Sequence, residues 1–235
     1  MTEADSAERR RRGRYGLLLG AIVVSFAVQG ITQPAVWEQV FTSVLLGITL
    51  LLAFWAADPK PKFMRPAAVV VACVIVLSVV EGVNGNVDDG ATRISNALLV
   101  LLAPPAIVIG VLRSMRAEQA VTLEAVFGVL CVYLLVGMFF AFMYGSVNEL
   151  GGSPFFAGGQ TATVARCLYY SFTTLTTVGY GDLVSRSNLG HTLSTFEALL
   201  GQIYLITVVS LLVTNLRPRR QRPLARKAAE GEEPG

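Results

Sequence analysis

Long apolar runs are the feature that most constrains how this 235-residue chain can fold. Hydrophobic residues make up 53% of the chain and charged residues only 15%, whereas about a quarter of an average soluble domain is charged. A helix that crosses a bilayer needs about 20 mostly apolar residues. Six stretches have this character: Tyr15–Thr32, Trp37–Ala57, Pro66–Val83, Ile94–Leu112, Val121–Tyr144 and Leu189–Leu216. The sequence therefore predicts an all-α integral membrane protein, not a soluble enzyme, a disordered chain or a disulfide-stapled scaffold.

The positions of Lys and Arg indicate how the chain lies in the bilayer. Six spans put both termini on one side, and 16 of the 19 basic residues lie on that side. The other three are Arg93, Arg166 and Arg186. Because basic loops are retained in the cytoplasm, we expect both termini on the cytoplasmic side. The membrane that we expect the chain to span is the plasma membrane. The net charge of +3 thus reflects topology, and we expect no nucleic-acid partner.

The segment between the fifth and sixth spans contains a helix-like run that is too short to cross a membrane. This run, Thr161–Thr174, follows a stretch with four glycines, Gly151–Gly159. Non-helical backbone at membrane depth is tolerated only when it is buried in protein or lines a watery cavity. The pattern therefore predicts a re-entrant helix that enters a pore or a binding site.

The residues directly after this run read TVGYG, and they are Thr177, Val178, Gly179, Tyr180 and Gly181. In this motif the sequence resembles the potassium channels, whose selectivity filter has this signature. K⁺ can exchange its water shell for backbone carbonyl oxygens only if successive carbonyls point toward one axis. Glycine adopts the backbone angles that this requires, which explains Gly179 and Gly181.

The resemblance also implies roles for individual residues. K⁺, the permeant ion, would bind at Thr177, Val178, Gly179 and Tyr180, and no cofactor is expected. The resemblance makes Thr176 a supporting residue of the filter, places Asp182 at its outer mouth and lets Tyr169 and Tyr170 brace the Tyr180 ring. These two tyrosines could also be packing residues only.

One filter loop per chain implies a homotetramer, because the carbonyl cage needs four copies around an axis. The sixth span would be the inner helix that lines the cavity. Its Gly201 is either a hinge that opens the gate or a site of close contact with the pore helix. Glu197 on the same helix could form a hydrogen bond behind the filter.

The first four spans resemble the sensor region of voltage-gated channels in number but not in charge. A voltage sensor needs several arginines along its fourth span, yet Ile94–Leu112 contains no charged residue. We also expect Pro104 and Pro105 to interrupt this helix. The sequence thus predicts a basic N-terminus (1–14), a four-helix sensor-like bundle without voltage sensing (15–116), a pore domain (117–216) and a disordered tail (217–235). The basic termini could bind anionic lipids, although topology alone also explains them.

Three other functions compete with that of a conducting channel. A membrane hydrolase is disfavoured because His191 is the only histidine and no Gly-x-Ser-x-Gly or His-Glu-x-x-His motif is present. A potassium transporter subunit would repeat its pore unit within one chain. A channel-like regulatory subunit that needs a partner or activator is the third function, and the sequence is compatible with it. Cys73, Cys131 and Cys167 lack a metal-ligand spacing, and the absence of disulfide or glycosylation signals suggests a prokaryotic protein.

Overall fold

The computed structural model describes residues 3–31, 36–57, 68–76, 79–80, 89–118 and 123–215. Its named elements are α1 (Glu3–Ile31), α2 (Val36–Ala57), α4 (Asp89–Glu118), α5 (Leu123–Leu150), the 3₁₀ turn η1 (Ala157–Gly159), α6 (Val164–Leu175) and α7 (Asn188–Asn215). Residues 68–76 and 79–80 are also helical. Over these ranges there is no β-strand, and an isolated bridge pairs Phe156 with Ser185. The predicted all-helical class is therefore confirmed for the described part of the chain, and the predicted tail lies outside it.

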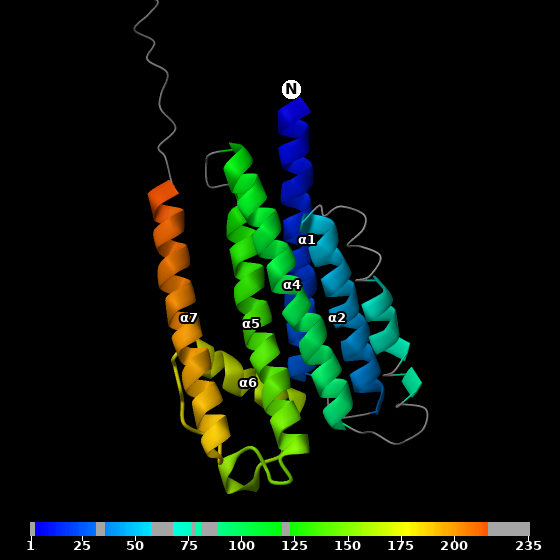
Figure 1. Cartoon of the computed structure of the whole chain (residues 1–235), viewed down its shortest axis with the longest axis vertical. Coiled ribbons are helices and arrows are strands. Elements are labelled where there is room, and N and C mark those ends of the chain that lie inside the picture. The colour runs from blue at the N-terminus through cyan, green and yellow to red at the C-terminus, as the bar shows by residue number, and fades with distance from the viewer. Residues whose placement is uncertain are drawn as a thin grey trace, which may run out of the picture.

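The long helices run along one common axis, and α6 is the exception (Figure 1). The start of α1 and the end of α7 lie at the same end of the molecule, and the loop that contains η1 lies at the opposite end (Figure 1). This agrees with an even number of spans. Which end faces the cytoplasm stays a prediction.

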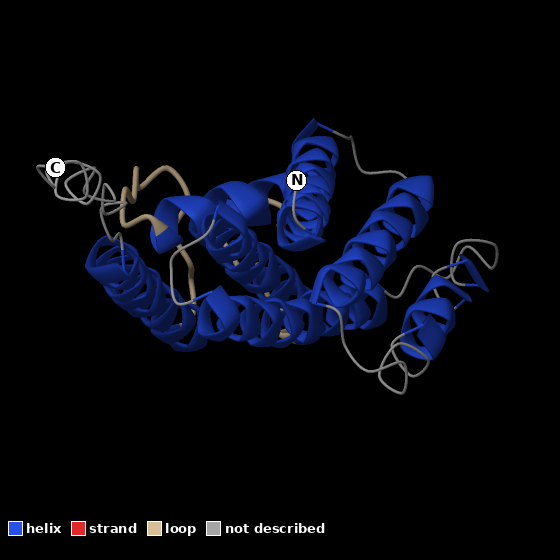
Figure 2. Ribbon diagram, turned by 90° about the horizontal axis from the view of Figure 1, so that it is seen from above, coloured by secondary structure: helices blue, strands red, loops and turns tan. Residues whose placement is uncertain are grey.

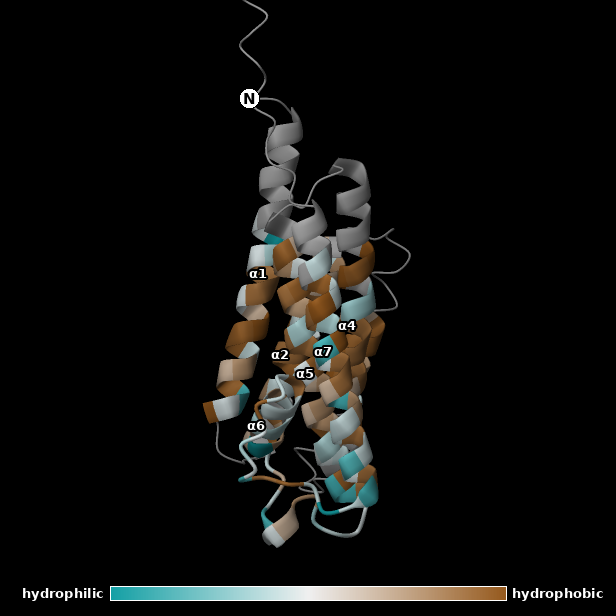
Figure 3. Cartoon of the chain, turned by 90° about the vertical axis from the view of Figure 1, so that its left-hand side faces the viewer, coloured by the Kyte–Doolittle hydropathy of each residue, from teal (hydrophilic) through white to brown (hydrophobic). Residues whose placement is uncertain are grey.

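Two described helices are long and apolar enough to cross a bilayer by themselves, Gly13–Ile31 and Ala125–Leu150. Their mean hydropathy is 1.6 and 2.5, respectively. Shorter apolar helices cover Phe41–Ala56 and Ile94–Ile109, and hydrophobic residues follow the length of the helices in Figure 3. These features fit a membrane protein. Much of the third predicted span, Pro66–Val83, lies outside the described residues, so the count of six spans stays a prediction.

The helix α5 packs both against the N-terminal helices and against the C-terminal helices α6 and α7. The helices α1, α2, α4 and α5 form a closed ring of contacts, α1 with α2, α2 with α4, α4 with α5 and α5 with α1, and Figure 2 shows them seen from above. The same α5 also packs against α6 and α7. The core of this bundle includes the fully buried side chains of Leu18, Ile22, Leu46, Leu50, Leu99 and Ile107. The N-terminal helices therefore pack directly on α5, which in turn packs against the short helix α6.

The prolines of α4 do not interrupt it, contrary to the expectation from the sequence. The helix continues from Asp89 to Glu118 with Pro104 and Pro105 inside it. Each proline removes one hydrogen bond to the carbonyl four residues earlier, but the remaining ladder and the packing of neighbouring helices can hold such a helix in a membrane. Close packing with α2 and α5 supplies that support, together with the 2.8 Å hydrogen bond from Ser43 Oγ of α2 to Asn96 Oδ1.

We predict that Gly137→Ala destabilises the protein by about 1–3 kcal/mol, the usual cost of overpacking. A Cβ at Gly137 of α5 would lie 2.6 Å from Phe172 Cζ of α6. The Phe172 ring is itself packed against the Phe26 ring, with the two ring centroids 4.9 Å apart. The control is Gly20→Ala, because a Cβ at Gly20 of α1 meets nothing within 4 Å. Thermal unfolding in detergent measures both variants, and equal midpoints would contradict the predicted close contact.

Candidate functional site

The short helix α6 is amphipathic and has a defined start. Its buried residues Cys167, Leu168, Ser171 and Leu175 recur at helical spacing, so one face packs inward. The Thr163 hydroxyl accepts a hydrogen bond from the backbone N–H of Arg166 at 3.3 Å, which is an N-cap. The helix thus begins at Val164, three residues after the predicted start of the run, and ends at Leu175, one residue after its predicted end.

The five residues of the TVGYG motif have an alternating backbone conformation. Thr177, Gly179 and Gly181 have φ of 58°, 51° and 80°, and the two residues between them do not have positive φ. Alternation between left- and right-handed residues turns successive peptide groups to the same side, as it does for the N–H groups of anion-binding nests. Backbone bonds to α6 hold this loop, from Thr177 N to Thr174 O at 2.9 Å and from Gly179 N to Thr173 O at 3.0 Å.

Thr177 is a strained residue that the sequence did not reveal. It is the one non-glycine with positive φ among the described residues, and a β-branched residue in this region is a genuine outlier that surrounding structure must hold in place. Its hydroxyl donates to Thr176 O at 2.7 Å and accepts from Gln202 Nε2 at 2.8 Å. Gln202 of α7 is thus a functional candidate that sequence reasoning missed, although a polar residue within an apolar helix was a signal.

The two adjacent tyrosines of α6 lie in different environments. The Tyr169 ring stacks on the Tyr180 ring, with centroids 6.2 Å apart and an interplanar angle of 6°. The Asp182 carboxylate lies beside the Tyr169 hydroxyl. Tyr169, Tyr180 and Asp182 therefore lie together at one end of the motif, and the bracing role of Tyr169 stays a prediction.

The Tyr170 side chain instead lies on the buried side of α6. Its ring packs against those of Tyr144, Phe155 and Phe156, at centroid distances of 5.1, 5.8 and 5.4 Å. Its hydroxyl is 2.7 Å from Ser194 Oγ of α7. Tyr170 therefore joins α6 to its supporting helices. Among the described residues, Tyr170 makes no ring contact with Tyr180.

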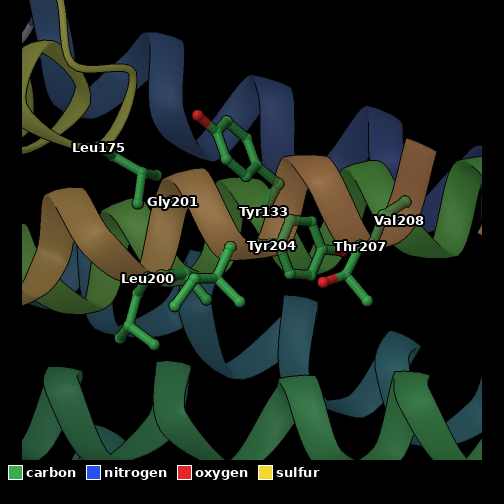
Figure 4. Close-up of a pocket in the computed structure, with 9 residues that line it drawn as sticks. Tyr133, Leu175, Leu200, Gly201, Tyr204, Thr207 and Val208 are labelled. Atoms are coloured by element: carbon green, nitrogen blue, oxygen red, sulfur yellow. The ribbon is translucent and has the colours of Figure 1, made fainter. Parts of the chain in front are cut away.

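Gly201 is a site of close contact between α7 and the end of α6. A Cβ there would lie 2.2 Å from the Leu175 carbonyl oxygen, so only glycine fits this approach. Beside the contact is a cavity of about 360 Å³ whose walls include Tyr133, Leu175 and Tyr204 (Figure 4). The structure supports the interpretation of Gly201 as a packing glycine, while the hinge role stays a prediction.

Glu197 of α7 is fully buried and bonded to both neighbouring helices. The Tyr144 hydroxyl of α5 donates to Glu197 Oε2 at 2.5 Å, and the Ser171 hydroxyl of α6 forms a hydrogen bond with Oε1. The sequence suggested Glu197 as a hydrogen-bonding residue behind the filter. Its carboxyl group contacts the buried face of α6, the helix that leads into the motif. His191 lies elsewhere, with Nε2 2.7 Å from Ser185 O, and the described residues contain no cluster of three metal-ligating side chains.

A comparison with known protein families matches the part of the chain that contains this site. Residues 128–217 match the family model of an ion channel. The chain is 32% identical over 111 residues to the voltage-gated potassium channel regulatory subunit KCNG1 of Mus musculus and of Rattus norvegicus, and 31% identical to that of Homo sapiens. The alignment covers 43% of this chain and 21% of each relative. These matches cover less than half of this chain, and they show a similarity to ion channels and, among them, to potassium channel subunits.

We predict that Gly201→Ala lowers the thermal midpoint in detergent more than Gly137→Ala does. The carbonyl of Leu175 that a new Cβ would meet is backbone and cannot rotate away, whereas the Phe172 ring beside Gly137 can shift. If Gly201 serves only as a hinge, alanine should leave the midpoint unchanged or raise it, because alanine favours helix by up to about 1 kcal/mol over glycine.

Proposed function

We propose that this protein forms a K⁺-selective pore as a homotetramer in the plasma membrane. The observation that supports this most directly is the alternation of positive φ at Thr177, Gly179 and Gly181 within the TVGYG motif. Such a backbone would direct the carbonyl oxygens of Thr177, Val178, Gly179 and Tyr180 toward one axis, where four copies would replace the hydration shell of K⁺.

The helix α6 and the residues around the motif would contribute to the electrostatics of this pore. The C-terminal carbonyls of α6 carry a partial negative charge, and they precede the motif directly, since α6 ends at Leu175. Asp182 is exposed on the other side of the motif. Both features favour a cation along the proposed path.

The exposure of the motif in a single chain supports assembly with further copies. Val178 and Tyr180 are 53% and 71% exposed, yet irregular backbone at membrane depth must be covered by protein or line a watery cavity. Large apolar side chains also lie exposed along one stripe of α7, namely Phe196, Leu199, Ile203 and Ile206. Their spacing of three and four residues is that of a helix-packing face.

The four N-terminal spans would then act as a scaffold and not as a voltage sensor. Phe26 of α1 packs against Phe172 of α6, so this region would support the pore helix directly. Both termini would lie in the cytoplasm, where the basic residues could contact anionic lipid headgroups. A prokaryotic origin remains part of this proposal.

A second candidate is a regulatory subunit that assembles with other channel chains. It is favoured by one observation, the name of the mouse, rat and human relatives. The two functions differ in one measurable property, because only the first predicts K⁺-selective conduction by the purified chain alone.

We predict that the purified chain in planar bilayers carries a current that reverses near the K⁺ equilibrium potential under a K⁺/Na⁺ gradient. Gly179→Ala should abolish this selectivity, since alanine resists φ of 51°. The control is Gly152→Ala, which imposes similar strain at φ of 62° in an exposed loop. A silent, well-folded wild type would favour the regulatory subunit, and a selective Gly179→Ala variant would contradict the filter assignment.

We also predict that Gln202→Met lowers the K⁺/Na⁺ permeability ratio by about five- to tenfold, the equivalent of one lost hydrogen bond of about 1–1.5 kcal/mol. Methionine has a similar length but cannot donate to the Thr177 hydroxyl, which Gln202 contacts at 2.8 Å. Gln160→Met, at an exposed loop position, should leave the ratio unchanged. Reversal potentials measure both variants.

A further inference from the structure

The carboxyl group of Glu197 and three groups from two other helices form one hydrogen-bonded cluster. The helix α5 provides the Gly137 carbonyl and the Tyr144 hydroxyl, α6 provides the Ser171 hydroxyl, and α7 provides Glu197 itself. The side chains of Tyr144, Ser171 and Glu197 are fully buried. Solvent therefore cannot complete any hydrogen bond that these groups leave open.

The hydrogens available to this cluster can be counted. Ser171 Oγ lies 2.6 Å from Gly137 O and is also hydrogen-bonded to Glu197 Oε1. A carbonyl oxygen only accepts, and an ionised carboxylate only accepts, but a serine hydroxyl has one hydrogen. If Glu197 were ionised, one of the two contacts of Ser171 would bring two oxygens together without a hydrogen between them.

A protonated Glu197 removes this conflict. The acid hydrogen on Oε1 is donated to Ser171 Oγ, and Ser171 donates its own hydrogen to Gly137 O. Tyr144 donates to Oε2, which is the acceptor oxygen of a neutral acid. Every hydrogen then has one acceptor, in a chain that runs from α7 through α6 to α5.

The surroundings of Glu197 offer no described positive charge to stabilise an ionised form. The titratable groups that face it are phenols, Tyr144 and Tyr133 from α5 and, through its contact with Tyr144, Tyr170 from α6. The only histidine, His191 of α7, is bonded to Ser185 O. Burying an unpaired charge is costly, and a buried group escapes that cost by becoming neutral.

We propose that Glu197 is a neutral carboxylic acid whose proton bonds the inner helix α7 to Ser171 of α6, and that Glu197 thereby acts as a positioning residue for the filter. The second half rests on the proposed function, because it assumes that α6 is the pore helix of a K⁺ channel. The first half concerns only the proton and can be tested without any conduction.

Infrared difference spectroscopy on the full-length protein in lipid tests the proton. A neutral acid has a carbonyl stretch well separated from the carboxylate bands, and this band should be present in the wild type near neutral pH and lost in Glu197→Gln. Glu149→Gln, at an exposed carboxyl group, should retain it. Loss of carboxylate intensity in Glu197→Gln, with no change in the acid band, would overturn the proposal.

Reversal potentials of reconstituted variants test the positioning role. Glu197→Gln should stay within about twofold of the wild-type K⁺/Na⁺ permeability ratio, since its amide group donates to Ser171 and accepts from Tyr144 as the neutral acid does. Glu197→Ala and Ser171→Ala should each lower the ratio by about tenfold, because each leaves buried partners unsatisfied.

The two arms separate failure of this inference from failure of the proposed function. A selective wild type with equal loss in Glu197→Gln and Glu197→Ala would overturn the positioning role. A non-selective wild type would instead contradict the proposed function, and the infrared band would still decide the state of the proton. If Glu197→Ala does not fold, the ratios of Glu197→Gln and Ser171→Ala decide the positioning role.

Discussion

An irregular backbone at membrane depth is stable only when protein satisfies and surrounds it, and the rest of this structure depends on that constraint. The motif Thr177–Gly181 is anchored at its start by α6, through the bonds of Thr177 and Gly179 to the last turn of that helix. The helix α6 is in turn fixed by close approach of two glycines, Gly137 on α5 and Gly201 on α7. Small residues allow helix backbones to approach closely where lipid offers no hydrophobic driving force for association.

Polar groups supply the second means of fixing α6, and they are arranged around its buried face. Ser171 connects it to α5 and α7, and the Tyr170 hydroxyl connects it to Ser194 of α7. Such bonds fix orientation as well as distance, which apolar contacts alone do not. The side chain of the neighbouring Tyr169 stacks on Tyr180 instead, so α6 packs against its supporting helices through one face and against the TVGYG motif through another.

The sequence predicted the parts of this arrangement that depend on local chemistry. Residue types and spacing were enough to predict where the short helix lies and which glycines need positive φ. They also showed that the stretch Ile94–Leu112 carries no charge. The strain at Thr177 and its bond to Gln202 could not be predicted, since both arise from the approach of α7 to a loop 25 residues earlier. Pro104 and Pro105 misled for a similar reason, because the contacts of α4 with α2 and α5 outweigh the local loss of two hydrogen bonds.

The N-terminal helix α1 contacts α6, the helix that precedes the TVGYG motif, and the stretch Ile94–Leu112 of α4 contains no charged residue. The helix α1 contacts both α5 and α6, and Phe26 meets the same Phe172 ring that fills the space over Gly137. A displacement of α1 would therefore press on the ring that sets the spacing between α5 and α6. Because packed interfaces move between discrete arrangements and do not deform continuously, the Phe26 and Phe172 rings hold α1, α5 and α6 at one mutual spacing.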